Sequence, residues 1–386
     1  MKAVGIICEY SPFHNGHLYH INKIREQFPN SPIILVMSGN FTERGIVSII
    51  DKWKKTEIAL TYGVDLVVEL PFVFATQSAD IFAKGSIALL KALQVEYLVF
   101  GSECGSLQPL IDLATIQLQH PDYDLLVKKY LKEGINYPTA MSKALMTLTK
   151  QTIVTPNDLL GLSYIKEIIK QQANIKPIVI QRTNDFHEET LENTIVSATA
   201  IRTALQNNQD IQPYVPEKTY TALTQQLYFM KDYFPLLQYK ISTDPRIFQY
   251  QTVDEGLDQR IRKEILKHDN LDDFVKAVKT KRYTYNKIMR MLCHILCSFT
   301  KEEASKCLEP AYLRILGMNQ VGRKYLKQLK KEVTLPLITA CTETNHLMMD
   351  IEFRSTCAFA SLLSLKEKKA IIHREFIKKP IIVKEK

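Results

Sequence analysis

Two histidines near the N-terminus have the type and spacing that could act on a phosphate group. His14 and His17 are separated by Asn15 and Gly16, directly after an apolar run at residues 4–8. Each imidazole can donate a hydrogen bond to a phosphate oxygen as negative charge builds on it, and preorganised donors lower a barrier by about 3–4 kcal/mol each. A single histidine in such a loop is usually an ordinary polar residue, but His-x-Gly-His after an N-terminal strand is more specific. The pattern predicts a nucleotide site.

The residues around the two histidines predict a strand, a tight turn and a helix. The apolar run is typical of a buried strand, and Pro12 prevents the strand ladder from continuing. Gly16 lets the backbone turn sharply and lets a ligand come close. From His17 onward, apolar residues recur at helical spacing. The free N–H groups of a helix start attract phosphate, so we expect this turn to hold a triphosphate.

Later apolar runs predict the remaining strands of an α/β domain. They are Pro32–Met37, Val64–Pro71, Val95–Phe100 and Pro177–Ile180. Helical segments lie between them, and this alternation predicts a Rossmann-like parallel sheet. Ligands of such sheets bind in the crevice at the carboxyl ends of the strands. The His motif and the loops after the other strands are therefore expected to share one edge.

Polar residues and a glycine stand where that edge is predicted. Gly101 follows a strand and can let an adenosine approach the backbone, and Arg182 could bind phosphate bidentately or stack on the base. Ser197 or Thr199 can cap a helix that begins there, and Arg202 lies in its first turn. Taken alone, Gly101 also fits a plain turn, and Ser-x-Thr at a helix start is usually only a cap.

The charge of the chain is unevenly distributed. Its 386 residues are 46% hydrophobic and 24% charged, which is ordinary for a globular protein and long enough for two domains. Residues 1–210 carry 19 Lys and Arg against 21 Asp and Glu, whereas residues 211–386 carry 31 against 20. A basic half joined to a neutral half predicts a polyanionic partner such as nucleic acid. A generally basic surface with no partner is the alternative.

The α/β alternation fades after Pro213 and Pro216, and the rest of the chain is predicted to be mainly helical. Residues 279–290 interleave basic and aromatic side chains, which suits phosphate contacts with a tyrosine stacked on an unpaired base. The solvated face of a helix is the alternative. The residues expected to contact RNA are Lys279, Lys281, Arg282, Tyr283, Lys287 and Arg290.

The cysteines and the hydropathy pattern point to a cytoplasmic protein. Seven cysteines without CxxC spacing fit reduced thiols. Cys293, His294 and Cys297 have apolar neighbours, which favours buried core thiols over a metal site, and we predict no metal ligands. No apolar run approaches the ~20 residues of a membrane helix, and the N-terminus lacks the sustained apolar segment of a signal peptide.

The motif residues resemble a known family. His14-Asn15-Gly16-His17 matches the HxGH signature of the HIGH-type nucleotidyltransferase superfamily, and the longer stretch from Glu9 resembles the tRNA(Met) cytidine acetate ligase family (TmcAL). The segment 197–202 resembles the second superfamily signature, which grips the β- and γ-phosphates. That family usually has Asn where this chain has Ser11, and commonly has Asn where it has Asp158. The resemblance implies a Rossmann-like nucleotidyltransferase domain at residues 1–212 and a basic, mainly α-helical, tRNA-binding domain at residues 213–386.

The resemblance also implies a reaction. Acetate would attack the α-phosphate of ATP, giving acetyl-adenylate and pyrophosphate, with His14 and His17 as catalytic residues and Mg²⁺ accompanying ATP. The exocyclic amine of the wobble cytidine in elongator tRNA(Met) would then take the acetyl group, giving N4-acetylcytidine and AMP. The residues expected to bind ATP are Ile7, Glu9, Tyr10, Ser11, Pro12, Phe13, His14, Asn15, Gly16, His17, His20, Gly101, Asn157, Arg182, Ser197, Thr199 and Arg202.

Several alternatives stay open from the sequence. The chain could be an adenylyltransferase acting on a small phosphorylated cofactor precursor, or a non-catalytic RNA-binding protein that retains a nucleotide fold. Arg44 and Lys52 could reach a phosphate or the acyl group, or could carry surface charge. Glu9 and Glu103 are possible bases for the amine proton. The oligomeric state is not predicted.

Overall fold

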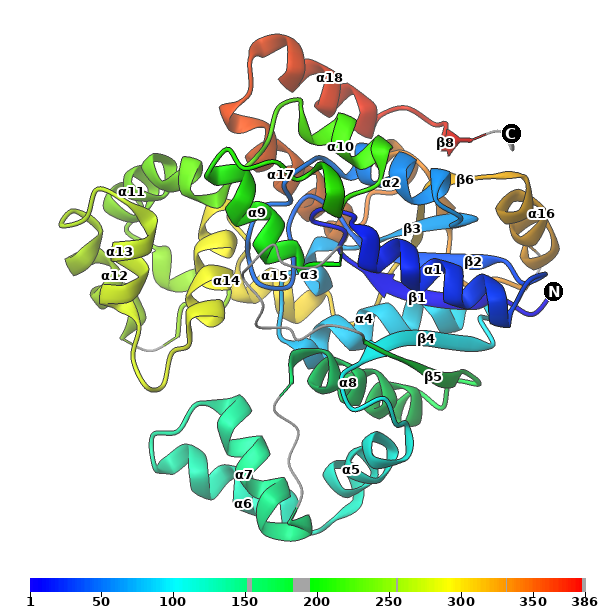
Figure 1. Ribbon diagram of the computed structural model, residues 1–386. Coiled ribbons are helices and arrows are strands. Elements are labelled where there is room, and N and C mark those ends of the chain that lie inside the picture. The colour runs from blue at the N-terminus through cyan, green and yellow to red at the C-terminus, as the bar shows by residue number, and fades with distance from the viewer. Residues whose placement is uncertain (151–154, 183–194, 255, 331, 384–386) are drawn as a thin grey trace.

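A computed structural model describes residues 1–150, 155–182, 195–254, 256–330 and 332–383. A central sheet has helices on both faces, and further groups of helices lie beside it (Figure 1). Within the described residues the sheet has eight strands in the order β5-β4-β1-β2-β3-β6-β7, with β8 paired to β6. The strands are β1 Val4–Cys8, β2 Ile33–Ser38, β3 Leu66–Leu70, β4 Tyr97–Ser102, β5 Lys176–Gln181, β6 Leu313–Met318, β7 Leu337–Ile338 and β8 Ile381–Ile382.

The parallel part of the sheet confirms the predicted α/β core. Strand β1 pairs in parallel with β2 and β4, β2 pairs with β3, and β4 pairs with β5. The predicted strands therefore exist, with bounds shifted by one or two residues. Because these strands run the same way, their carboxyl ends lie along one edge, where the sequence predicts the ligand site.

Alternating side chains of the strands fill two hydrophobic clusters. In β2, Ile34 and Val36 belong to one cluster, whereas Ile33, Leu35 and Met37 belong to the other. Successive side chains of a strand point to opposite faces, and a strand covered on both faces reads as a continuous apolar run. This explains why the strands were visible in the sequence as unbroken apolar segments.

Different helices cover the two faces. The helices of the first half are α1 Asn15–Gln27, α2 Lys52–Thr61, α3 Phe72–Ala75, α4 Ala79–Ala92, α5 Gln108–Gln119, α6 Tyr123–Lys132, α7 Tyr137–Thr149, α8 Pro156–Lys170 and α9 Ala198–Gln206. Helices α1, α2 and α9 pack on one face, and α4, α5 and α8 contribute to the cluster on the other. In Figure 1, α6 and α7 extend away from the sheet below α8.

The second half of the chain completes the sheet as well as forming helices. Its helices are α10 Glu217–Leu223, α11 Phe234–Thr243, α12 Leu257–Ile265, α13 Leu271–Val278, α14 Tyr285–Leu296, α15 Lys301–Lys306, α16 Gln320–Leu329, α17 Leu347–Phe359 and α18 Leu365–Glu375. Strand β6 pairs antiparallel with β3, placing Ile315 opposite Val68, and β7 and β8 pair with β6. These three strands were not predicted from the sequence. The second half is mainly helical, as predicted, but the sheet crosses the predicted boundary at residue 212.

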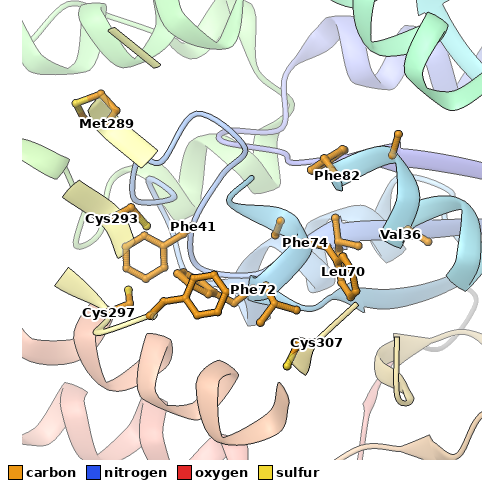
Figure 2. Packing of buried hydrophobic residues seen from close by; sticks show 14 of the residues in the cluster. Val36, Phe41, Leu70, Phe72, Phe74, Phe82, Met289, Cys293, Cys297 and Cys307 are labelled. Atoms are coloured by element: carbon orange, nitrogen blue, oxygen red, sulfur yellow. The ribbon is translucent and has the colours of Figure 1, made fainter. Parts of the chain in front are cut away.

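Helix α14 packs against the aromatic centre of the larger cluster. Figure 2 shows Cys293 of α14 and Cys297, the C-cap residue of α14, beside Phe41 and Phe72. The rings of Phe41 and Phe72 meet edge to face with their centroids 5.8 Å apart. Both cysteines are buried, which confirms their predicted core role. This contact joins α14 to the loop after β2, because Phe41 belongs to that loop.

Candidate active site

His14 and His17 lie side by side at the start of α1, with ring centroids 3.8 Å apart. The helix begins at Asn15, two residues earlier than predicted, and His14 is its N-cap. Nδ1 of His14 accepts a hydrogen bond from the N–H of Gly16 at 3.1 Å, and Nδ1 of His17 accepts one from the N–H of His14 at 3.2 Å. A neutral ring that accepts at Nδ1 carries its proton on Nε2. Each ring therefore has an Nε2–H donor to offer a ligand.

The two rings are held in the neutral form. Burial lowers the pKa of His14 to about 3 and lowers the pKa of His17 well below its usual range. The positive charge of Arg182 acts in the same direction on both rings. At neutral pH the pair is thus a set of fixed dipolar donors rather than two cations.

Other residues of the motif hold the turn by packing and hydrogen bonds. Tyr10, Ser11 and Phe13 are buried. The hydroxyl of Ser11 accepts a hydrogen bond from the N–H of Ile49 at 3.1 Å, and Phe13 stacks on Tyr62 with centroids 5.4 Å apart. The predicted residues Ile7, Glu9, Pro12, Asn15 and His20 lie in β1, in the turn or in α1. Direct contact of these side chains with ATP stays a prediction.

A second group gathers at the ends of β4 and β5. The amide of Asn157 donates to the carboxylate of Glu103, and Nε of Arg182 lies 3.8 Å from Oε1 of Glu103. A Cβ added to Gly101 would come within 3.3 Å of the Arg182 side chain. The structure therefore brings Gly101, Asn157 and Arg182 together, as predicted, and Glu103 is the carboxylate that joins them.

Buried polar atoms in this region fit a nucleotide ligand. Nε2 of His20, Nε of Arg182 and Oε2 of Glu103 are buried and have no hydrogen-bond partner among the described residues. Buried polar groups are nearly always hydrogen-bonded in folded proteins. Nε of Arg182 is a donor, Nε2 of His20 can donate or accept, and Oε2 of Glu103 can accept a hydrogen bond. Groups of these kinds suit the phosphates, ribose hydroxyls or base of a nucleotide.

Asp158 organises the turn after β4, a role that sequence reasoning did not assign. One carboxylate oxygen accepts from the hydroxyl of Ser102 at 2.6 Å and from the N–H of Glu103 at 3.1 Å. The other accepts from the N–H of Cys104 at 3.1 Å and from the hydroxyl of Thr155 at 2.7 Å. The four bonds fix the segment that carries Glu103. A capping residue one position after Asn157 was the available signal in the sequence.

The second signature meets the first at the start of α9. The hydroxyl of Ser197 caps the helix by accepting from the N–H of Ala200 at 3.0 Å. Arg202 donates to the carbonyl of Ser11 at 2.6 Å and to the hydroxyl of Thr199 at 3.0 Å. The two motifs, which are far apart in the sequence, are therefore joined through the Arg202 guanidinium. Burial lowers the pKa of this group to about 10.

The ends of β1 and β2 are tied together by a buried lysine. Nζ of Lys55 donates to the carbonyls of Glu9, Ser38 and Gly39 at 2.9, 2.8 and 2.7 Å. Oε1 of Glu9 accepts from the N–H of Glu43 at 2.6 Å and from the hydroxyl of Ser38 at 3.2 Å. Glu9 thus holds the loop after β2 and does not stand free as a base.

Lys52 lies in a buried charge cluster, so neither alternative from the sequence, contact with a phosphate or acyl group or a surface charge, fits its position. Its Nζ is 2.7 Å from Glu69, 3.0 Å from Glu375 and 3.4 Å from Glu352. Arg314 lies 3.0 Å from Glu69 and 2.6 Å from Glu375. All five residues are buried. This charge cluster joins α2, β3, β6, α17 and α18, and it is a feature of the scaffold.

Known proteins share this arrangement over the whole chain. The model of the HIGH Nucleotidyl Transferase family matches residues 1–374. The tRNA(Met) cytidine acetate ligase of Anoxybacillus flavithermus is 42% identical over 99% of this chain and 100% of that protein. The chain belongs to the tRNA(Met) cytidine acetate ligase family. The ligase of Bacillus subtilis is 36% identical over 92% of this chain and 91% of that protein.

Solved structures of the TmcAL family match the fold closely. The apo crystal structure of Thermotoga maritima TmcAL matches with a TM-score of 0.93 at 30% identity, over 100% of both chains. The same protein bound with alpha-thio ATP matches with a TM-score of 0.90 at 29% identity, over 99% of this chain and 100% of that chain. The architecture described above, including the strands contributed by the second half, is therefore the TmcAL architecture.

In this TmcAL member some of the predicted RNA-contacting residues are exposed, and the others are buried or paired with carboxylates. Lys279, Lys281 and Arg282 are exposed on the loop before α14, and RNA contact there stays a prediction. Tyr283 is only 8% exposed and belongs to the hydrophobic core. Its ring is covered by the protein, which does not fit the predicted stacking on an unpaired base.

The two predicted RNA contacts on α14 itself pair with carboxylates. Lys287 forms an ion pair with Asp254. Nη1 of Arg290 lies 2.8 Å from Oε1 of Glu43, and the two side chains are 15% and 22% exposed. Sequence spacing indicated the helix correctly but could not show which charges have partners inside the protein.

Proposed function

We propose that this chain activates acetate with ATP as acetyl-adenylate and transfers the acetyl group to N4 of the wobble cytidine of elongator tRNA(Met). The observation that carries the proposal is the pair of neutral imidazoles at the start of α1, whose ring centroids lie 3.8 Å apart and on which the positive charge of Arg182 acts. The full-length match to ligases named for tRNA(Met), one of them solved with an ATP analogue, supports the substrate assignment.

In the proposed first half-reaction each of these residues has a part. The Nε2–H groups of His14 and His17 donate to oxygens of the α-phosphate, where charge builds as acetate attacks. The N–H groups at the start of α1 hold the triphosphate, and Gly16 keeps that approach open because it has no side chain. Arg182 binds the nucleotide opposite the histidines, and Arg202 serves the β- and γ-phosphates from α9.

Magnesium enters with ATP rather than in a protein cage. No group of three His, Cys, Asp or Glu that could hold a metal occurs among the described residues. Mg²⁺ commonly keeps several waters and binds mainly through substrate phosphates. We therefore infer that the phosphates of ATP would hold the cation, which would neutralise charge that repels acetate.

The partner and the compartment follow from charge and cysteine usage. The excess of Lys and Arg lies in residues 211–386, and the exposed residues Lys279, Lys281 and Arg282 are the proposed RNA contacts. All seven cysteines are free, and no described helix is long and apolar enough to cross a membrane. A tRNA substrate and reduced thiols agree with a cytoplasmic location.

The experiment that tests this function is acetate-dependent exchange of labelled pyrophosphate into ATP. Wild-type protein should exchange labelled pyrophosphate into ATP when acetate is present. His14→Ala and His17→Ala should each lower this rate by about 10²–10³-fold, the usual effect of removing one preorganised donor. Exchange stimulated by a phosphate ester but not by acetate would favour the cofactor adenylyltransferase. No ATP binding at all would favour the non-catalytic RNA-binding protein.

A further inference from the structure

The loop after β2 is fixed at Glu43 from two directions. Its N–H donates to the carboxylate of Glu9 at 2.6 Å, so one side of the loop is attached to the end of β1. Its carboxylate accepts from Nη1 of Arg290 at 2.8 Å, and the same guanidinium nitrogen lies 3.4 Å from its carbonyl oxygen. Glu43 therefore links the strand that leads into the His motif to helix α14.

The loop also touches α14 through backbone and aromatic contacts. Gly45 has φ +73°, and a Cβ added there would lie 2.4 Å from the Cα and N atoms of Arg290. Only a glycine allows this approach, since the conformation and the space both exclude a side chain. On the other side of Glu43, Phe41 packs beside Cys293 of α14 (Figure 2). Three successive points of the loop, at residues 41, 43 and 45, thus rest on one helix.

The contacts of residues 41, 43 and 45 with α14 affect the active site in two ways, through Glu9 and through Arg44. Glu9 lies between β1 and the His motif, and its carbonyl is held by Lys55 at 2.9 Å. Arg44 stands between the two anchor points, Glu43 and Gly45. Its charge acts on the carboxylates of Glu9 and Glu43 and on Arg202. A loop free to shift on α14 would move both Arg44 and Glu9.

We propose that Arg290 is a positioning residue for acetate activation, acting through Glu43 and Glu9, and that it is not an RNA contact. The proposal rests on the proposed function. It assigns a basic residue of the tRNA-binding half to the first half-reaction, which takes place before any acetyl group reaches RNA. The exposed charges on the loop before α14 keep the RNA role.

The test compares Arg290→Gln, Glu43→Gln and the double variant in two assays. The first is acetate-dependent pyrophosphate exchange, resolved into kcat and KM. The second is tRNA affinity as a function of salt. The matched control is Arg354→Gln, because Arg354 also pairs with a glutamate, Glu303, at 2.9 Å with partial exposure, while its Nε donates to the carbonyl of Cys297 at 3.0 Å and not to Glu43. Thermal unfolding of all variants shows whether they fold.

We expect Arg290→Gln and Glu43→Gln each to lower kcat for exchange by about tenfold to a hundredfold, as small misplacements near a reacting centre do. The double variant should be no slower than the slower single variant, because both changes break one connection. Arg290→Lys, which keeps a charged donor, should recover part of the rate. Affinity for tRNA and its salt slope should stay as in wild type, and Arg354→Gln should exchange normally.

Two results would overturn the proposal. One is normal exchange by Arg290→Gln together with weaker tRNA binding and a salt slope reduced by about one, which is the signature of a lost phosphate contact. The other is a double variant whose loss is the product of the single losses, which would mean independent roles. Wild-type protein that shows no acetate-dependent exchange would instead refute the proposed function. The positioning claim would then be judged by ATP affinity, which Arg290→Gln should weaken and Arg354→Gln should not.

Discussion

Two isosteric substitutions in the buried charge cluster should have very different effects on stability. Glu352 and Glu375 are both buried, with 1% and 0% of their surface exposed to solvent. Burial and the neighbouring Glu69 raise the pKa of Glu352 to about 8, so this side chain is protonated at neutral pH. Burial opposes ionisation of Glu375, but Lys52 and Arg314 outweigh it and lower its pKa. The cluster is then balanced, with two cations facing two carboxylates.

The charge balance sets the expected magnitudes. Glu375→Gln removes a carboxylate that lies 3.0 Å from Lys52 and 2.6 Å from Arg314, and it leaves a buried positive charge uncompensated. Removing one partner of a buried pair costs about 3–5 kcal/mol. Glu352→Gln replaces a neutral carboxyl by a neutral amide that can still accept from the N–H of Phe72. We expect it to cost less than about 1.5 kcal/mol, the scale of one neutral hydrogen bond.

The assay is urea unfolding at pH 7 followed by tryptophan fluorescence. Trp53 is the single tryptophan of the chain, and its ring centroid lies 5.5 Å from Nζ of Lys52, so it reports directly on the cluster. Equal losses of unfolding free energy in Glu352→Gln and Glu375→Gln would refute the assigned charge states. A larger loss in Glu352→Gln would refute them as well.

The same pair of variants carries a pH signature. The pKa of Glu352 is raised from 4.5 to about 8 in the folded chain. Between pH 4.5 and pH 8 this side chain is therefore ionised in the unfolded chain but still protonated in the folded chain. The contribution of Glu352 to stability therefore falls as pH rises through this window. The Glu352→Gln variant has no titrating group at this position. Its free energy of unfolding relative to wild type should therefore improve as the pH rises from 5, just above the usual carboxyl pKa, to 8.

Further predictions concern the active site and the RNA surface. A Cβ in Gly16→Ala would lie 2.8 Å from Cε1 of His14, so the ring should move and pyrophosphate exchange should fall by about tenfold or more; an unchanged rate would contradict the assigned ring position. Because burial lowers the pKa of His14 to about 3, kcat/KM for exchange should show no acid limb near the ordinary imidazole value of about 6.5. A limb at that value, seen in wild type and lost in His14→Asn, would show that the ring titrates normally. Lys281→Gln with Arg282→Gln should weaken tRNA binding and reduce the salt slope by about 0.7–0.9 for each lost contact, with exchange unchanged; an unaltered slope would place the RNA contacts elsewhere.

The active-site edge could be predicted because its information is local. Apolar runs mark the parallel strands, and the residues that follow them must meet where parallel strands end. This is why His14, Gly101 and Arg182, which are distant in sequence, were expected together and are found together. The helix cap at Ser197 was visible for the same reason, since a cap is set by residues three apart.

The remaining features depend on partners that local spacing does not reveal. Strand β6 contains Arg314, a charge that is unusual in a buried strand until its partners Glu69 and Glu375 are seen. The basic stretch before and within α14 looks uniform in the sequence, yet Tyr283 is buried and Arg290 is paired with Glu43. The residues of these ion pairs are between 61 and 247 positions apart in the sequence, and only the packed fold brings them together.

The measurement that tests the central claim most directly is transfer of labelled acetate to RNA, with purified protein, ATP and either elongator or initiator tRNA(Met), followed by nucleoside analysis. The account predicts label in N4-acetylcytidine only when ATP is present and only with the elongator tRNA, together with release of AMP. Unlabelled RNA, with ATP consumed in response to a different small acid or a phosphate ester, would contradict it.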